Sequence, residues 1–151
     1  MYIKIYYFGK LKNQSLKELK QKYLILLSAW NVDMIELKES KIKDVPKKQT
    51  EDFKILSKNL DKNYKAILLD ERGKNMTSQN FANSLEEASF AGQKTAFIIG
   101  PTFGFQEEDK SIFNEKIGLS KMTFTHEMAQ IILLEQLYRA FSIINNKSYH
   151  Y

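Results

Sequence analysis

The sequence predicts an α/β fold built around a mostly parallel sheet. Short segments rich in β-branched and aromatic residues alternate with segments whose apolar residues recur at helical spacing. The alternation extends over the whole of residues 1–151, a length typical of a single domain, without an evident repeat, low-complexity tract or linker. Strands separated by helices in this way are typical of a parallel sheet.

The composition narrows the classes of function. Hydrophobic residues make up 43% of the chain, as in a folded domain. Cysteine is absent, which excludes disulfides, thiolate catalysis and cysteine metal sites, and also methylation of uracil carbon-5 through a cysteine adduct. The net charge of +5 suits a polyanion such as RNA, but it is equally typical of a lysine-rich protein with no such partner. With no signal-peptide pattern and no apolar run of about 18 residues, we expect a cytoplasmic protein without a membrane contact.

The periodicity gives each element approximate bounds. Strands are expected at residues 2–8, 32–37, 65–69, 95–99 and within 117–124, and helices at about 15–29, 50–60, 78–91, 107–114 and 127–145. Ser15 with Glu18 has capping-box spacing, Thr77 or Ser78 can cap the third helix, and Thr125 can cap the last.

Residues 38–48 read as a loop with Pro46 as a helix breaker. The loop contains five lysines: Lys38, Lys41, Lys43, Lys47 and Lys48. Two interpretations remain open: the lysines face solvent, or they contact RNA phosphates.

Three loops are candidates for a ligand site, because ligands of parallel sheets bind at the carboxyl ends of the strands. These loops follow Leu69, follow Ile99 and include Leu119–Phe124. Gly100 opens the second loop, either because a turn needs positive φ or because a ligand approaches the backbone closely. The chain has no Gly-x-Gly-x-x-Gly fingerprint, which argues against a nicotinamide site.

The last predicted helix is apolar around most of its circumference, from Met128 to Ile144. Such a helix is normally buried. We expect one face to pack on the sheet and the other on a second subunit, giving a homodimer. Complete burial within one protomer is the alternative.

Four residues near this helix are candidates for chemistry. His126 at its start is either solvated or functional, and Arg139 within it either pairs with Glu135 or contacts the ligand, the target base or a phosphate. Tyr149 and His150 follow the helix. Tail residues are disordered by default, but aromatic ones suggest docking.

Several of these motifs together resemble a known family. Residues 120–126 read SKMTFTH, residues 133–141 read LLEQLYRAF, and a Tyr-His pair occupies 149–150; LDERGK at 69–74 and Ile98–Gly100 add weaker matches. The chain is similar along its whole length to the ribosomal RNA large-subunit methyltransferase H family of the SPOUT class.

The resemblance implies a fold with a C-terminal trefoil knot, a homodimer, and transfer of a methyl group from S-adenosylmethionine without a metal. The implied substrate is a pseudouridine of 23S ribosomal RNA in the ribosome, methylated on ring nitrogen-3. The implied donor-binding residues are Leu69, Gly100, Leu119, Ser120, Lys121, Met122, Thr123 and Phe124, and the implied catalytic residues are His150, Arg139, His126 and Tyr149.

The chain departs from the family pattern at Pro101, Gln130 and Tyr151, where a second glycine and two basic residues are usual. Two alternatives therefore stay open. One is another SPOUT activity such as ribose 2′-O-methylation, and the other is a catalytically idle domain that binds RNA or the ribosome.

Overall fold

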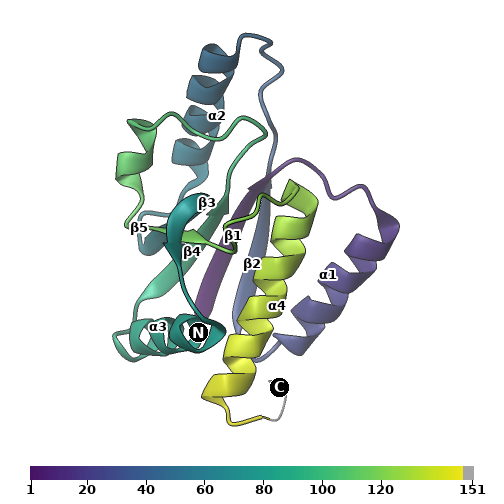
Figure 1. The fold of residues 1–151 in the computed structure, drawn as a ribbon, viewed down its shortest axis with the longest axis vertical. Helices are drawn as coiled ribbons and strands as arrows, with labels where there is room; N and C mark the ends of the chain where they lie inside the picture. Colours follow the sequence, from purple (N-terminus) through teal and green to yellow (C-terminus); the bar gives the residue numbers. More distant parts are fainter. Residues whose placement is uncertain (148–151) are drawn as a thin grey trace.

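The computed structural model describes residues 1–147, which form one sheet with helices on both faces (Figure 1). The strands are β1 (Tyr2–Phe8), β2 (Asn31–Leu37), β3 (Tyr64–Asn75), β4 (Lys94–Ile99) and β5 (Glu115–Gly118). The helices are α1 (Gln14–Leu26), α2 (Val45–Asn59), α3 (Ser78–Phe90) and α4 (His126–Ile144), with a 3₁₀ turn at Asp109–Ile112. No helix within residues 1–147 is long and apolar enough to cross a membrane.

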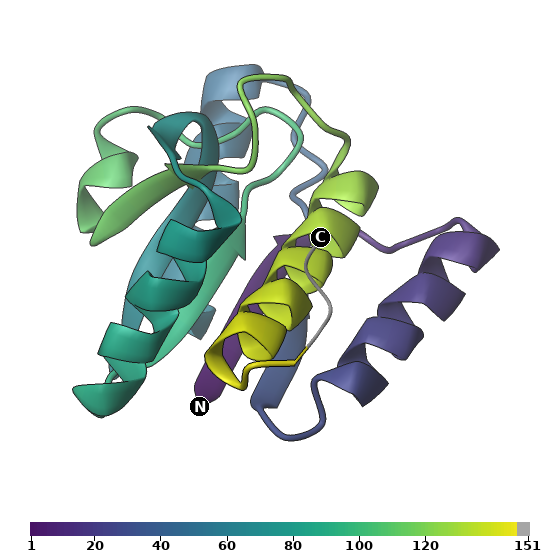
Figure 2. The ribbon, with the colours of Figure 1, turned by 60° about the horizontal axis from the view of Figure 1, so that its bottom comes forward.

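All five strands are parallel, in the order β2-β1-β4-β3-β5. Figure 2 shows α1, α4 and α3 side by side on one face, with α4 in the middle, and α2 on the other face. The sheet has a hydrophobic core on each face, and alternate residues of the central strands point into one core or the other. Ile5 and Phe97 are buried in the core on the α4 face, and Tyr6 and Ile98 in the core on the α2 face. The predicted fold class is confirmed, and the knot stays a prediction.

Two boundaries differ from the sequence-based expectations at helix starts. Asn13 rather than Ser15 caps α1, because its side chain accepts the Leu16 amide at 3.1 Å. Pro46 lies in the first turn of α2 instead of breaking a helix, and Asp44 is the N-cap. Proline is tolerated there because the first amides of a helix have no intrahelical acceptor. Thr77 and Thr125 cap their helices as predicted.

Two strand ends differ as well. β3 continues through Asn75 instead of ending at Leu69, since it resumes pairing with β5 after a register shift between Leu69 and Lys74. The fifth strand, expected within residues 117–124, is shorter and earlier, at Glu115–Gly118, and Leu119–Phe124 is a loop, as the prediction of the ligand site assumed.

Gly73 is the point at which this irregular part of β3 passes β5. A Cβ atom there would lie 2.7 Å from backbone atoms of Lys116 and Ile117. That spacing is shorter than a van der Waals contact, and backbone atoms cannot rotate away as a side chain can. Only glycine fits, and this close approach sets the path of Asp70–Gly73.

We therefore expect Gly73→Ala to destabilise the fold by about 2–3 kcal/mol, the cost of forcing extra volume into a packed contact. Urea unfolding followed by circular dichroism measures it. A loss below about 0.5 kcal/mol, the range of ordinary surface changes, would mean that β3 and β5 separate easily.

The burial of α4 corrects one expectation. Six apolar side chains of this helix are at most 6% exposed within the single chain: Ile131, Leu133, Leu134, Leu137, Ala140 and Phe141. The sheet, α1 and α3 surround the helix, and Tyr138, Ile143 and Ile144 also pack on this core. The alternative of burial within one protomer is therefore the correct one for most of α4, and the helix does not need a second subunit to cover it.

Candidate functional site

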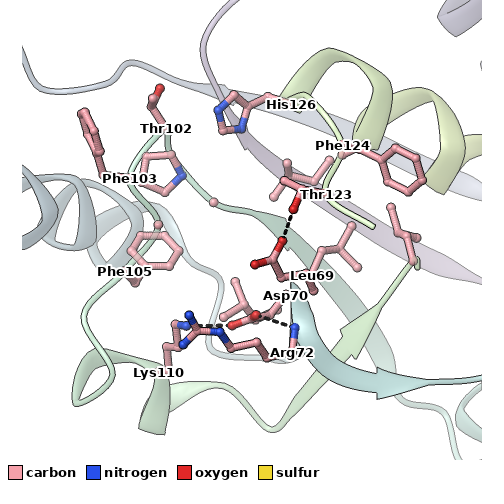
Figure 3. A pocket seen from close by; sticks show the side chains of 18 of the residues that line it. Leu69, Asp70, Arg72, Thr102, Phe103, Phe105, Lys110, Thr123, Phe124 and His126 are labelled. Carbon is pink, nitrogen blue, oxygen red and sulfur yellow. Dashed lines mark hydrogen bonds and ion pairs between the residues drawn. The ribbon is translucent and has the colours of Figure 1, made fainter. Parts of the chain in front are cut away.

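A cavity of about 410 Å³ opens at the carboxyl ends of β4 and β5, beside the irregular part of β3 that follows Leu69. Its walls are the three loops that the sequence singled out: residues 69–72, 99–105 and 119–124. Figure 3 shows His126 and Phe124 at one end, where α4 begins, and the ion pair of Asp70 with Lys110 at the other. Seven of the eight predicted donor-binding residues line the cavity, and Lys121 does not.

The loop after β4 is held by hydrogen bonds from the segment after β2 and from α2. Both the amide and the hydroxyl of Thr102 donate to Glu39 Oε1, at 3.0 and 2.8 Å. The side chain of Gln49 donates to the Phe103 carbonyl at 2.8 Å. Gly104 carries the positive φ of this loop, +64°, and its amide closes a turn on the Pro101 carbonyl. The backbone path along this wall is therefore set before a ligand binds.

Lys48 connects this loop to the core beneath it. Its Nζ lies 2.8 Å from Glu39, 2.9 Å from Asp52 and 2.7 Å from the Ser40 carbonyl, and the side chain is 8% exposed. Burial alone would lower the pKa of Lys48, but hydrogen bonds to Glu39 and Asp52 outweigh it, so the pKa is raised. Burial likewise favours a high pKa for Glu39, but hydrogen bonds from Lys48 and Thr102 outweigh it, so the pKa is lowered. Both groups are charged at neutral pH. Lys48 thus differs from the other four lysines of residues 38–48, which are exposed.

Lys48→Met should destabilise the protein by about 3–5 kcal/mol, because it leaves the buried Asp52 carboxylate without its cation. Urea unfolding measures the loss. Lys47→Met, one residue away on the exposed surface, is the matched control and should change stability by less than about 0.5 kcal/mol. Equal stability of the two variants would show that water replaces the Lys48 contacts.

The far end of the cavity contains a second ion pair. Lys110 Nζ lies 2.7 Å from Asp70 Oδ2, and the Arg72 amide donates to Asp70 Oδ1 at 2.9 Å. Burial raises the pKa of Asp70, but the bonds from Lys110 and Arg72 outweigh it and hold the pKa below its ordinary value. A carboxyl with a lowered folded-state pKa stabilises the fold above its unfolded pKa, and this contribution is lost as the pH falls through the folded pKa. The pair is therefore intact at neutral pH.

The third wall of the cavity is the loop of residues 119–124, which leads into α4. The Thr123 hydroxyl donates to Glu71 Oε2, which links this wall to the irregular part of β3. Thr125 caps α4 through a bond from the Met128 amide at 3.3 Å, as its sequence position predicts. Three apolar side chains on the cavity wall remain exposed: Phe103 at 51%, Met122 at 74% and Phe124 at 39%.

The structure describes two of the four predicted catalytic residues, His126 and Arg139, and it does not bring these two together. His126 lines the cavity. Arg139 lies 13 residues along α4 from it, or about 20 Å at 1.5 Å per residue, and it pairs with Glu135 at 2.7 Å, as one interpretation expected. Tyr149 and His150 lie outside the described residues, as does Tyr151.

Several residues that line the cavity were not among the predicted site residues. Asp70, Lys110, Thr102 and Phe103 line the cavity without having been proposed for it. Asp70 directly follows a predicted strand, and that position was a usable signal. Gln130 is 1% exposed, and its Oε1 has no hydrogen-bond partner among the described residues. Its side chain is therefore not a surface RNA contact within this chain.

A preformed cavity at the carboxyl edge of a parallel sheet, with glycine on its wall, defines an α/β ligand-binding protein. The family model described as "Predicted SPOUT methyltransferase" matches residues 1–150. Proteins named ribosomal RNA large subunit methyltransferase H are similar along their whole length. That of Malacoplasma penetrans is 37% identical, with 99% of each chain covered. That of Pseudothermotoga lettingae is 38% identical, and the match covers both chains completely. That of Thermodesulfovibrio yellowstonii is 41% identical, and the match covers 98% of this chain and 97% of the relative. The chain belongs to the SPOUT methyltransferases and, within them, to the ribosomal RNA large subunit methyltransferase H family.

SPOUT methyltransferases take the methyl group from S-adenosylmethionine, and the cavity fits a ligand of that size. Gly100 gives a specific test of the fit. A Cβ atom there would meet the Phe105 ring at 3.5 Å and the Gly104 Cα at 3.9 Å, both ordinary contacts. The fold therefore does not require glycine at position 100, and the interpretation that a turn demands positive φ applies to Gly104 instead. Close approach of a ligand to the Gly100 backbone stays a prediction.

Proposed function

We propose that the protein methylates large-subunit ribosomal RNA, and that the target atom is ring nitrogen-3 of a pseudouridine in 23S RNA. The observation that carries the proposal is the cavity, formed by the three loops that match the family motifs, in a chain with full-length relatives named for this class of reaction. Ribosomes are in the cytoplasm, so we place the protein there as well.

Methyl transfer to nitrogen-3 requires the chain to hold the methyl donor, to remove a proton and to stabilise the resulting anion. S-adenosylmethionine supplies a methyl group on a sulfonium centre. The three cavity walls hold this donor so that the methyl faces the incoming base, since displacement needs nitrogen, carbon and sulfur in line. A base such as His150 or His126 takes the imide proton from nitrogen-3, and a cation such as Arg139 favours the anion that remains. Tyr149 contributes a ring beside the base.

The position of Lys147 supports a role for His150 at the cavity of a second copy. The Lys147 amide donates to the Ser142 carbonyl at 2.8 Å, so the chain at Lys147 is still beside the end of α4. Ser142 lies about 24 Å along α4 from His126. The last described residue, Lys147, is therefore far from the donor cavity of its own chain. We therefore propose a homodimer, and the exposed apolar side chains on the cavity wall support it because they offer a surface to cover.

Mixing two inactive variants tests this arrangement. Gly100→Val removes the donor site and His150→Ala removes the base, and in a mixed dimer one cavity has both. Recovery of roughly a quarter of wild-type activity is expected, from half the dimers with one working cavity each. No recovery, in a mixture that light scattering shows to be dimeric and that has exchanged subunits, would mean that His150 serves its own chain or has no role.

Nucleoside mass spectrometry of ribosomal RNA from a strain lacking the protein tests the proposed reaction. Loss of a methylated pseudouridine supports it. Loss of a 2′-O-methyl nucleoside would favour the ribose activity, and an unchanged nucleoside profile would favour an idle binding domain.

A further inference from the structure

A second hollow of about 440 Å³ lies beside α1, next to the ends of β1 and β2. Three cations line it, Lys10, Lys17 and Lys20, against one carboxylate, Glu36. Lys10 and Lys17 are exposed and Lys20 is half-buried. The hollow therefore carries a net positive charge that solvent can reach.

Two of its polar groups are held in position. Lys20 Nζ lies 3.1 Å from the Tyr7 hydroxyl oxygen and 4.5 Å from the centre of the Tyr7 ring. The hydroxyl accepts this bond, so it keeps its own hydrogen to donate. Gln21 adds an amide on the same wall. One cation held in place, Lys20, with two exposed lysines and neutral donors beside it suits phosphate oxygens, which accept hydrogen bonds and carry negative charge.

A hydrogen bond links the loop at one edge of this hollow to the first turn of α4, where His126 lines the methyl-donor cavity. The loop of residues 9–13 lies at one edge of the hollow, where Lys10 and Leu11 line it. Lys12, next in the chain, donates its amide to Glu127 Oε1 at 2.5 Å, and Glu127 follows His126, which lines the donor cavity. A strand of nucleic acid with one base in the cavity can therefore pass its backbone over this loop.

We propose that this hollow, the basic hollow, binds backbone phosphates of the RNA that flank the target nucleotide. The inference rests on the proposed function, because it takes RNA as the substrate. Phosphate contacts of this kind fix the register of the RNA without reading its sequence.

The test compares two double variants with the same change in charge. Lys10→Gln with Lys17→Gln alters the basic hollow. Lys58→Gln with Lys62→Gln alters two exposed lysines at the end of α2 and before β3, which is the amino edge of the sheet. Ribosome binding is measured by sedimentation across a series of salt concentrations, and calorimetry with S-adenosylmethionine is run on the same samples.

The hollow variant should bind ribosomes on the order of tenfold more weakly, with a salt slope lower by about 2, one per lysine removed. The control variant should match the wild type, and the donor should bind all three proteins equally. Equal binding of both variants to ribosomes, or an equal loss in both, would overturn the basic hollow. Methyl transfer by the wild type is a separate measurement: its absence would count against the proposed function, while the binding comparison still decides the role of the hollow.

Discussion

Gly100→Val should abolish binding of S-adenosylmethionine while leaving the fold intact. A Cβ at this position meets only ordinary contacts, so the protein can accept the side chain. The valine methyl groups instead occupy space that Gly100 leaves open on the cavity wall. We expect a loss of at least about 100-fold in affinity, equivalent to about 2.7 kcal/mol, in calorimetric titration.

Gly100→Ala is the graded control and should weaken binding less than valine does. Circular dichroism and thermal unfolding of both variants should match the wild type. A normal titration heat in the valine variant would show that the donor binds elsewhere.

Deleting residues 149–151 should reduce methyl transfer by about 100-fold or more, the scale of a lost general base. Affinity for S-adenosylmethionine should stay nearly unchanged, because the cavity walls come from residues 68–129. The dimer should also persist. Single-turnover methylation of ribosomes with saturating donor measures the chemical step.

His150→Ala alone should account for much of that loss, and Tyr149→Phe, which keeps the ring, for little of it. If the truncated protein methylates ribosomes at the normal rate, the role of base passes to His126, the histidine that lines the cavity.

The sheet and the three cavity walls could be predicted because they depend on local patterns. Alternation in Tyr2–Phe8 and short apolar runs before Asp70 and Gly100 predict strands, and the rule that ligands bind at their carboxyl ends selects the loops. The prediction for Pro46 was wrong because a proline can either break a helix or occupy its first turn. Asp44, two residues earlier, is the N-cap that makes Pro46 part of the first turn.

Long-range contacts explain most of what was not predicted. Lys48 is one of five lysines in a polar stretch, and only the packing of α2 on the sheet buries it between Glu39 and Asp52. The apolar circumference of α4 correctly predicts that the helix is buried, but the sequence does not show that α1 and α3 flank it. The approach of Gly73 to β5 likewise depends on a register shift that no local motif encodes.

Methyl transfer from this cavity to nitrogen-3 of a pseudouridine in 23S RNA, as we propose it, can be measured directly. The most direct measurement combines purified protein, ribosomes from a strain that lacks it, and S-adenosylmethionine with an isotope-labelled methyl group. Digestion of the RNA to nucleosides and mass spectrometry then locates the label. We expect labelled 3-methylpseudouridine from 23S RNA, and none when Gly100→Val replaces the wild type. Label on a ribose 2′-oxygen, or no label from a protein that binds the donor, would contradict the proposal.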